Sequence, residues 1–176
     1  AIYKTVENME RLVNKDINDP HIRKIAGKIY DKCNGVDICM AKAIFDFVLK
    51  NVEYKYDHEN VINYIDTKNI EDVKNTEFVI SPRHLADPNN NITQGDCDDM
   101  TVLYCVLAKA VGLPCRMKII AWKNQEFSHV YPAVGINHPE VGWIWVPADP
   151  VIKELLADKE PGHKKRLIGF QIKKLN

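Results

Sequence analysis

The sequence predicts an α+β domain in which helices come first along the chain and an antiparallel sheet follows. Apolar residues recur at helical spacing through the first half, and short runs rich in β-branched and aromatic residues follow residue 115. The chain has 176 residues, of which 45% are hydrophobic. It is therefore long and apolar enough for one domain with its own core.

Three amphipathic segments in the first half are predicted to be helices. The third has the clearest apolar stripe, with Met40, Ile44 and Phe47 on one face. A fourth helix is predicted to begin at Cys97 and to end where Gly112 can cap it and Pro114 prevents its continuation. The first three predicted helices span residues 4–15, 21–32 and 37–52.

The second half is predicted to form strands joined as hairpins, followed by a short helix and a last strand. The predicted strands span residues 116–122, 127–136, 142–146 and 167–173, the hairpin turns residues 123–126 and 137–140, and the short helix residues 151–157. Residues 58–94 form a long irregular stretch. We expect this stretch to border a functional site, because long loops in compact domains often do.

The charge balance excludes some classes of partner. Lysine and arginine number 24, as do aspartate and glutamate, which argues against nucleic-acid binding driven by bulk charge. No apolar run is long enough to span a bilayer, and the start of the chain lacks the apolar segment of a signal peptide. We expect neither nucleic acid nor membrane as a partner, and a cytoplasmic or phage/virion-associated location.

Five cysteines, an odd number, do not fit a disulfide framework and favour a reducing compartment. Cys33 and Cys39 flank a turn, which leaves open either a local disulfide or two reduced cysteines at helix ends. Cys105 is expected to pack within its helix and Cys115 to be structural. A zinc site from Cys33, Cys39 and a histidine lacks a familiar spacing, so we expect no metal and no other cofactor.

Three residues have the chemistry of an activated thiol nucleophile. Cys97 follows a turn glycine and starts a helix, where the dipole and free N–H groups favour a thiolate. His129 lies in a predicted strand, and Asp149 comes just after another. A cysteine, a histidine and an aspartate supply the attacking group, the base and the group that orients the base.

The carboxylates beside Cys97 oppose a low thiol pKa, because nearby negative charge disfavours a thiolate. Asp96, Asp98 and Asp99 are either helix caps that complement the dipole, the preferred interpretation, or ligands of a cation such as calcium. The backbone N–H of Cys97 is the expected oxyanion donor, because it lies at a free helix N-terminus. A second donor is needed, and the candidates are Gln94, His84 and Asn91, with Gln94 preferred.

These motifs together resemble the transglutaminase-like superfamily, over roughly residues 36–151. The residues that carry the resemblance are Gly95–Asp99, Leu103, Leu107, Gly112, Pro114, Arg116, His129–Tyr131, Gly142–Trp143 and Val146–Pro150. The resemblance implies a papain/transglutaminase-like core, with the nucleophile at the N-terminus of a central helix packed on an antiparallel sheet. With the chain length, it predicts a single domain over 1–176, in which a helical extension (1–35) precedes the core (36–151) and a helix and strand (152–176) follow.

The residues of these motifs are most similar to those of the bacterial, archaeal and phage branch of this superfamily, which is rich in cysteine peptidases and amide hydrolases. Pseudomurein endoisopeptidases are one relative with this triad. The resemblance therefore implies a cysteine peptidase or isopeptidase that hydrolyses an amide bond of a protein or peptide, cell-wall peptides included. Two alternatives stay open: a non-catalytic binding or assembly module, and a crosslinking transglutaminase. Tyr131 and Asp98, which replace aromatic residues often found there, speak against crosslinking.

Overall fold

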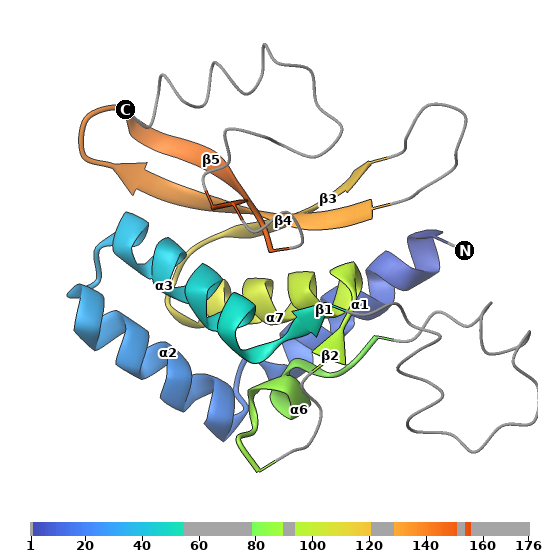
Figure 1. The fold of residues 1–176 in the computed structure, drawn as a ribbon. Helices are drawn as coiled ribbons and strands as arrows, with labels where there is room; N and C mark the ends of the chain where they lie inside the picture. Colours follow the sequence, from blue (N-terminus) through green and yellow to red (C-terminus); the bar gives the residue numbers. More distant parts are fainter. Residues whose placement is uncertain (1, 55–78, 90–93, 121–128, 151–153, 156–176) are drawn as a thin grey trace, which may run out of the picture.

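The computed structural model describes residues 2–54, 79–89, 94–120, 129–150 and 154–155, and the account below is confined to them. Helices and an antiparallel sheet form two layers, as the sequence predicted (Figure 1). The helices are α1 (Ile2–Asp16), α2 (Pro20–Cys33), α3 (Asp37–Asn51), the short α6 (Pro82–Ala86) and α7 (Cys97–Ala110). None of the described helices is both long and apolar enough to cross a membrane.

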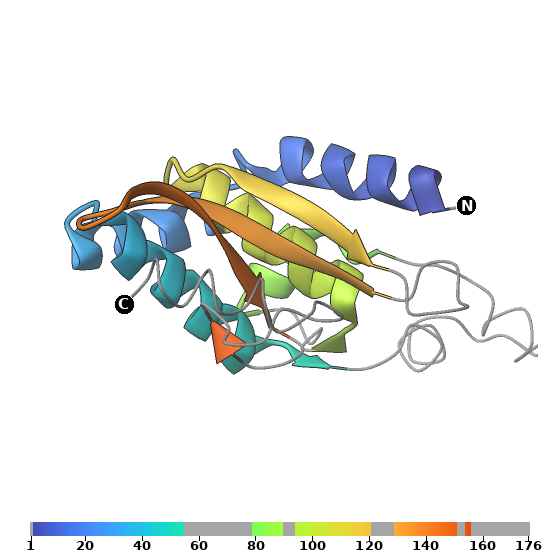
Figure 2. The same cartoon turned by 90° about the horizontal axis from the view of Figure 1, so that it is seen from above.

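The sheet has the strand order β3-β4-β5-β6, and each neighbouring pair is antiparallel. Its strands are β3 (Cys115–Ile120), β4 (His129–His138), β5 (Gly142–Asp149) and β6 (Glu154–Leu155). A separate pair, β1 (Glu53–Tyr54) and β2 (Gln94–Gly95), runs parallel, so that the chain just before α7 is held beside the end of α3. Seen from above, the long strands cross over α7 (Figure 2).

Helix α7 is the centre of the core. The helices α1, α2 and α3 pack against it on one side, and the strands β3 and β4 pack against it on the other. Every residue from Asp99 to Ala108 is buried as a result. A helix that is enclosed on all sides needs apolar residues around its whole circumference, and the sequence of α7 provides them.

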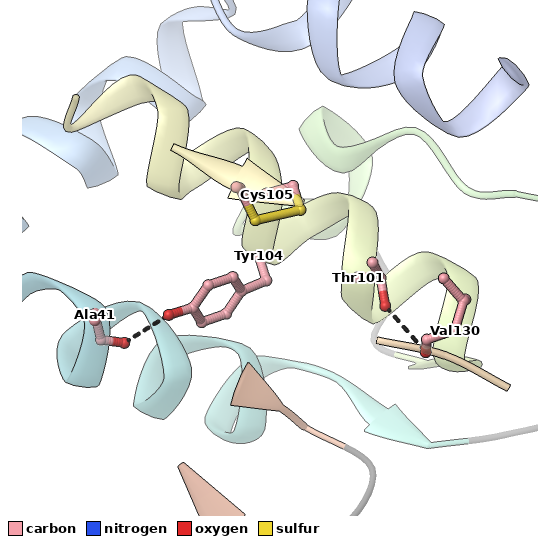
Figure 3. The surroundings of a disulfide bond; sticks show 6 residues. Ala41, Thr101, Tyr104, Cys105 and Val130 are labelled. Atoms are coloured by element: carbon pink, nitrogen blue, oxygen red, sulfur yellow. Dashed lines mark hydrogen bonds between the residues drawn. A yellow bond between two sulfur atoms is a disulfide. The ribbon is translucent and has the colours of Figure 1, made fainter. Parts of the chain in front are cut away.

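Two side chains in the middle of α7 join it to its neighbours (Figure 3). The hydroxyl of the fully buried Tyr104 donates a hydrogen bond of 3.1 Å to the carbonyl of Ala41 in α3. The next residue, Cys105, forms a disulfide with Cys115 at the start of β3, with 5.4 Å between the Cα atoms. The central helix is thus fixed to a helix on one side and to a strand on the other.

The disulfides correct the prediction that was based on cysteine number. Cys105 and Cys115 are paired, because the chain reverses at Gly112, where φ is +89°, and returns β3 to the side of α7. Cys33 and Cys39 form the local disulfide that the sequence left open. Disulfides persist mainly in oxidising compartments and inside some hyperthermophiles, so they argue against the reducing compartment. The location of the protein stays a prediction.

The predicted boundaries agree with the structure for the four long helices but not for the ends of β4 and β5, and α6 forms and β2 begins within the stretch of residues 58–94 that was predicted to be irregular. The ends of the four long helices lie within two residues of the predicted ones. Glu154 and Leu155, predicted as helix, instead pair with Asp149 and Ala148 as the edge strand β6, because the end of β5 offers backbone groups for pairing. Strand β4 extends to His138, which shifts the following turn. Residues 123–126 and 167–173 lie outside the described part, as do most of residues 58–94.

The disulfides predict the number of thiols that react in the denatured protein. All five cysteines lie in described segments, and Cys97 is the one that forms no disulfide. Unfolding in denaturant without reductant should therefore allow one maleimide label per chain, and reduction should raise this number to five. Intact mass measurement distinguishes the two states. Three or more labels before reduction would show that at least one of the two disulfides is not formed.

Candidate active site

The turn before α7 is held by a reciprocal pair of side-chain hydrogen bonds. Asp96, the N-cap, accepts from the backbone N–H groups of Asp98 at 3.0 Å and Asp99 at 3.3 Å. The Asp99 carboxylate accepts in turn from the backbone N–H of Asp96 at 2.9 Å. This is a capping box with aspartate at both positions. It confirms the capping interpretation for Asp96 and Asp99.

Asp99 also joins this turn to the segment before α6. Its side chain is fully buried, and its second oxygen accepts from the backbone N–H of Ile80 at 2.6 Å. Gly95 is required by the same carboxylate, because a Cβ at this position would lie 2.7 Å from the Cβ of Asp99. The motif Gly95–Asp99 therefore encodes a fixed turn that places Cys97 at the first position of α7.

Cys97 is partly buried, and its thiol donates to the Asp98 carboxylate at 3.6 Å. Burial raises the pKa of this thiol well above its ordinary value, and the charges of Asp98 and Asp96 raise it further. A hydrogen bond from the backbone N–H of Val130 has the opposite effect on the thiol pKa and favours the thiolate. The raised pKa favours the protonated thiol, and so opposes the effect on the pKa that was expected from the helix N-terminus. Ionisation of Cys97 needs a base.

His129 and Asp149 form a buried pair at one edge of the sheet. His129 is the first residue of β4 and Asp149 the last of β5, and their Nε2 and Oδ2 atoms are 2.6 Å apart. The aspartate side chain is 0% exposed and the histidine side chain 10%. Because the carboxylate accepts a hydrogen bond from Nε2–H, the lone pair on Nδ1 is the one that can act as a base. Tyr131 stacks on the imidazole, with 5.9 Å between ring centroids, and restricts its orientation.

The N-terminal part of α7, which begins with Cys97, contacts the start of β4, which begins with His129. Val130, which donates to the Cys97 sulfur, directly follows His129 in the chain. Asp149 holds the imidazole from the neighbouring strand. Within the described residues the thiol of Cys97 is bonded to Asp98 and not to His129. Chemically, the arrangement provides a nucleophile, an oriented base and a buried carboxylate that stabilises the imidazolium.

The candidate oxyanion donors belong to different segments of the chain. The backbone N–H of Cys97 is at the open end of α7. Gln94 lies three residues earlier in β2, and its side-chain amide donates to Glu53 at 3.4 Å. His84 is an exposed residue of α6, and Asn91 lies outside the described part of the chain. Gln94 stays the preferred candidate for the second oxyanion donor, because β2 leads directly into the turn before Cys97.

The calcium alternative concerns the same acidic residues. Asp96, Cys97 and Asp98 each place one possible ligand atom within 4.8 Å of the others. Asp96 already accepts two backbone hydrogen bonds, and Asp98 accepts a hydrogen bond from the thiol. Helix capping and the contact with the thiol therefore account for these two carboxylates without a cation.

Comparison with known proteins gives one match. The family model of the transglutaminase-like superfamily matches residues 23–150, which contain Cys97, His129 and Asp149. The match begins inside α2, earlier than the expected residue 36, and ends one residue after β5. Neither the search of curated proteins nor the search of solved structures gave a significant match. The branch within the superfamily stays a prediction.

Replacement of Asp99 is predicted to destabilise the fold. Asp99→Ala removes the acceptor of two backbone N–H groups, those of Ile80 and Asp96, and should lower the free energy of unfolding by about 2–4 kcal/mol. The matched control is Asp98→Ala in the same helical turn, which is only partly buried and should cost less than about 1 kcal/mol. Urea denaturation of both variants tests this difference. Equal losses would contradict the role of Asp99.

Replacement of Asp98 is predicted to change thiol reactivity. Asp98→Asn removes a negative charge that raises the thiol pKa, and should therefore lower this pKa. Each unit of lowering gives about tenfold more thiolate at a pH well below the pKa. The rate of Cys97 alkylation by iodoacetamide should therefore rise at pH 8. Asp46→Asn, an exposed residue of α3, is the control and should have no effect. An unchanged profile in Asp98→Asn would contradict the charge effect.

Proposed function

Because the chain belongs to the transglutaminase-like superfamily, we propose that it is a thiol-dependent acyl-transfer enzyme, and specifically a cysteine peptidase or isopeptidase. The observation that carries the proposal is the buried His129–Asp149 pair, on the strands that face the start of α7. Cys97 lies at that start, and of the five cysteines, all of which the structure describes, it is the one outside a disulfide. Burial of an ionisable pair costs desolvation free energy, and buried titratable groups of this kind are concentrated at catalytic sites. This cost favours catalysis over the binding-module alternative.

The proposed reaction begins when Nδ1 of His129 takes the thiol proton of Cys97. The sulfur then attacks the carbonyl carbon of an amide, and the backbone N–H of Cys97, together with the Gln94 amide, stabilises the oxyanion. The tetrahedral intermediate collapses as the imidazolium protonates the leaving amine, and a thioester remains on Cys97. Water, deprotonated by His129, attacks the thioester, releases the carboxylic acid and restores the thiol. Asp149 stabilises the imidazolium throughout.

Hydrolysis and crosslinking differ only in the acceptor that resolves the thioester. A primary amine in place of water would give a new amide and make the protein a transglutaminase. Turnover of a peptide or isopeptide library, followed with and without a labelled primary amine, separates the two activities. Release of free acid without amine incorporation supports the hydrolase. Efficient incorporation of the amine would assign crosslinking instead.

The nucleophile is tested by Cys97→Ala. This variant should lose all measurable turnover of any peptide or isopeptide that the wild type cleaves, because no thioester can form. Its thermal unfolding should stay close to that of the wild type, since Cys97 forms no disulfide. Turnover that survives in a folded Cys97→Ala variant would rule out the proposed mechanism.

The orienting carboxylate is tested by Asp149→Asn. The amide keeps the size of the side chain but can bind the imidazole in the wrong tautomer, and in serine proteases this change costs about 10⁴-fold in kcat. We expect a loss of at least about a hundredfold in kcat, with little change in KM, because Asp149 acts through His129 and not on the substrate. A loss confined to KM would place Asp149 in substrate binding.

A further inference from the structure

The start of β4 has a strand neighbour on one side only. On the β3 side, His129 and Val130 pair with Ile120 and Ile119. On the β5 side, the strand register begins only at Ala133. The backbone of Val130 is therefore not paired with β5, although Val130 is buried. Buried backbone groups need partners from another part of the protein.

Two side chains of α7 supply these partners. The N–H of Val130 donates to the Cys97 sulfur. The carbonyl of Val130 accepts from the hydroxyl of Thr101 at 3.4 Å (Figure 3). Cys97 and Thr101 are four residues apart and so lie on the same face of the helix, one turn from each other. Together they bind the N–H and the carbonyl of Val130, which β5 does not reach.

Thr101 stands out within α7. It is fully buried, and the residues on either side of it in the chain, Met100 and Val102, are apolar core residues. A buried hydroxyl without a partner is unfavourable, and its carbonyl partner would be equally so. The bond at 3.4 Å is long for a hydroxyl donor, but its loss would leave the buried carbonyl of Val130 without this partner. Its position, one residue after His129, matters more than its strength.

We propose that Thr101 is a positioning residue whose hydroxyl holds Val130 against α7 and thereby keeps His129 beside Cys97. Asp149 and Tyr131 fix the orientation of the imidazole within the sheet. Thr101 fixes the position of that part of the sheet relative to the helix that carries the nucleophile. The inference rests on the proposed function, because the placement of His129 matters only if His129 is the base for Cys97.

The test is a double-mutant cycle on the rate of Cys97 alkylation by iodoacetamide at pH 7, which needs no knowledge of the substrate. Thr101→Val keeps the shape of the side chain but removes the hydroxyl, and Thr101→Ser keeps the hydroxyl. We expect Thr101→Val to slow alkylation by about tenfold, the order expected for one lost hydrogen bond at a buried site, and Thr101→Ser to stay within about twofold of the wild type. In the His129→Ala background, Thr101→Val should have no further effect.

Each outcome of the cycle has a distinct meaning. If Thr101→Val slows alkylation by the same factor with and without His129, the hydroxyl has a general structural role and the inference is wrong. If His129→Ala slows alkylation but Thr101→Val does not, the inference fails while the proposed function stands. If His129→Ala itself has no effect, the proposed function fails, and the inference with it. Should Thr101→Val not fold, Thr101→Ala removes the same hydroxyl without placing a methyl group against the Val130 carbonyl.

Discussion

The enclosure of α7 on every side is the constraint on which the rest of the structure depends. Helices cover it on one side and the sheet on the other, so that ten consecutive residues from Asp99 to Ala108 are buried. A helix in this position cannot shift without disrupting the packing around it. Cys97, its first residue, is held in place by this packing. A nucleophile needs such a fixed position in order to keep its geometry relative to a base.

The start of this helix combines structural and chemical demands that oppose each other. The carboxylates that cap it stabilise the turn, yet Asp96 and Asp98 also raise the pKa of the thiol. The N–H of Val130 only partly offsets this effect. These effects favour a neutral thiol, so in the proposed mechanism His129, oriented by a carboxylate 2.6 Å away, takes the proton. Because ionisation of the thiol depends on His129 in this mechanism, the contacts that position the start of β4 also matter for the reaction.

The sequence was sufficient for the elements whose signals are local. Capping residues before Cys97 and the stop at Gly112 and Pro114 predicted both ends of α7. The disulfide between Cys105 and Cys115 could not be predicted, because it depends on where β3 lies once the chain has reversed. The bond from Ile80 to Asp99 has the same origin, since it joins segments 19 residues apart. Thr101 is a polar residue within an otherwise apolar stretch of α7. This pattern indicates a buried hydrogen bond, and it could have been recognised in the sequence.

In the proposed mechanism, His129 uses Nε2–H to bind Asp149 and keeps Nδ1 as the base for Cys97. Long-range proton–nitrogen correlation spectra of the imidazole, recorded at neutral pH on the wild type and on Cys97→Ala, test it most directly. We expect Nε2 to carry the proton in the neutral imidazole, and loss of the thiol to change the Nδ1 chemical shift. A neutral imidazole protonated at Nδ1, with a Nδ1 chemical shift unchanged in Cys97→Ala, would contradict this mechanism.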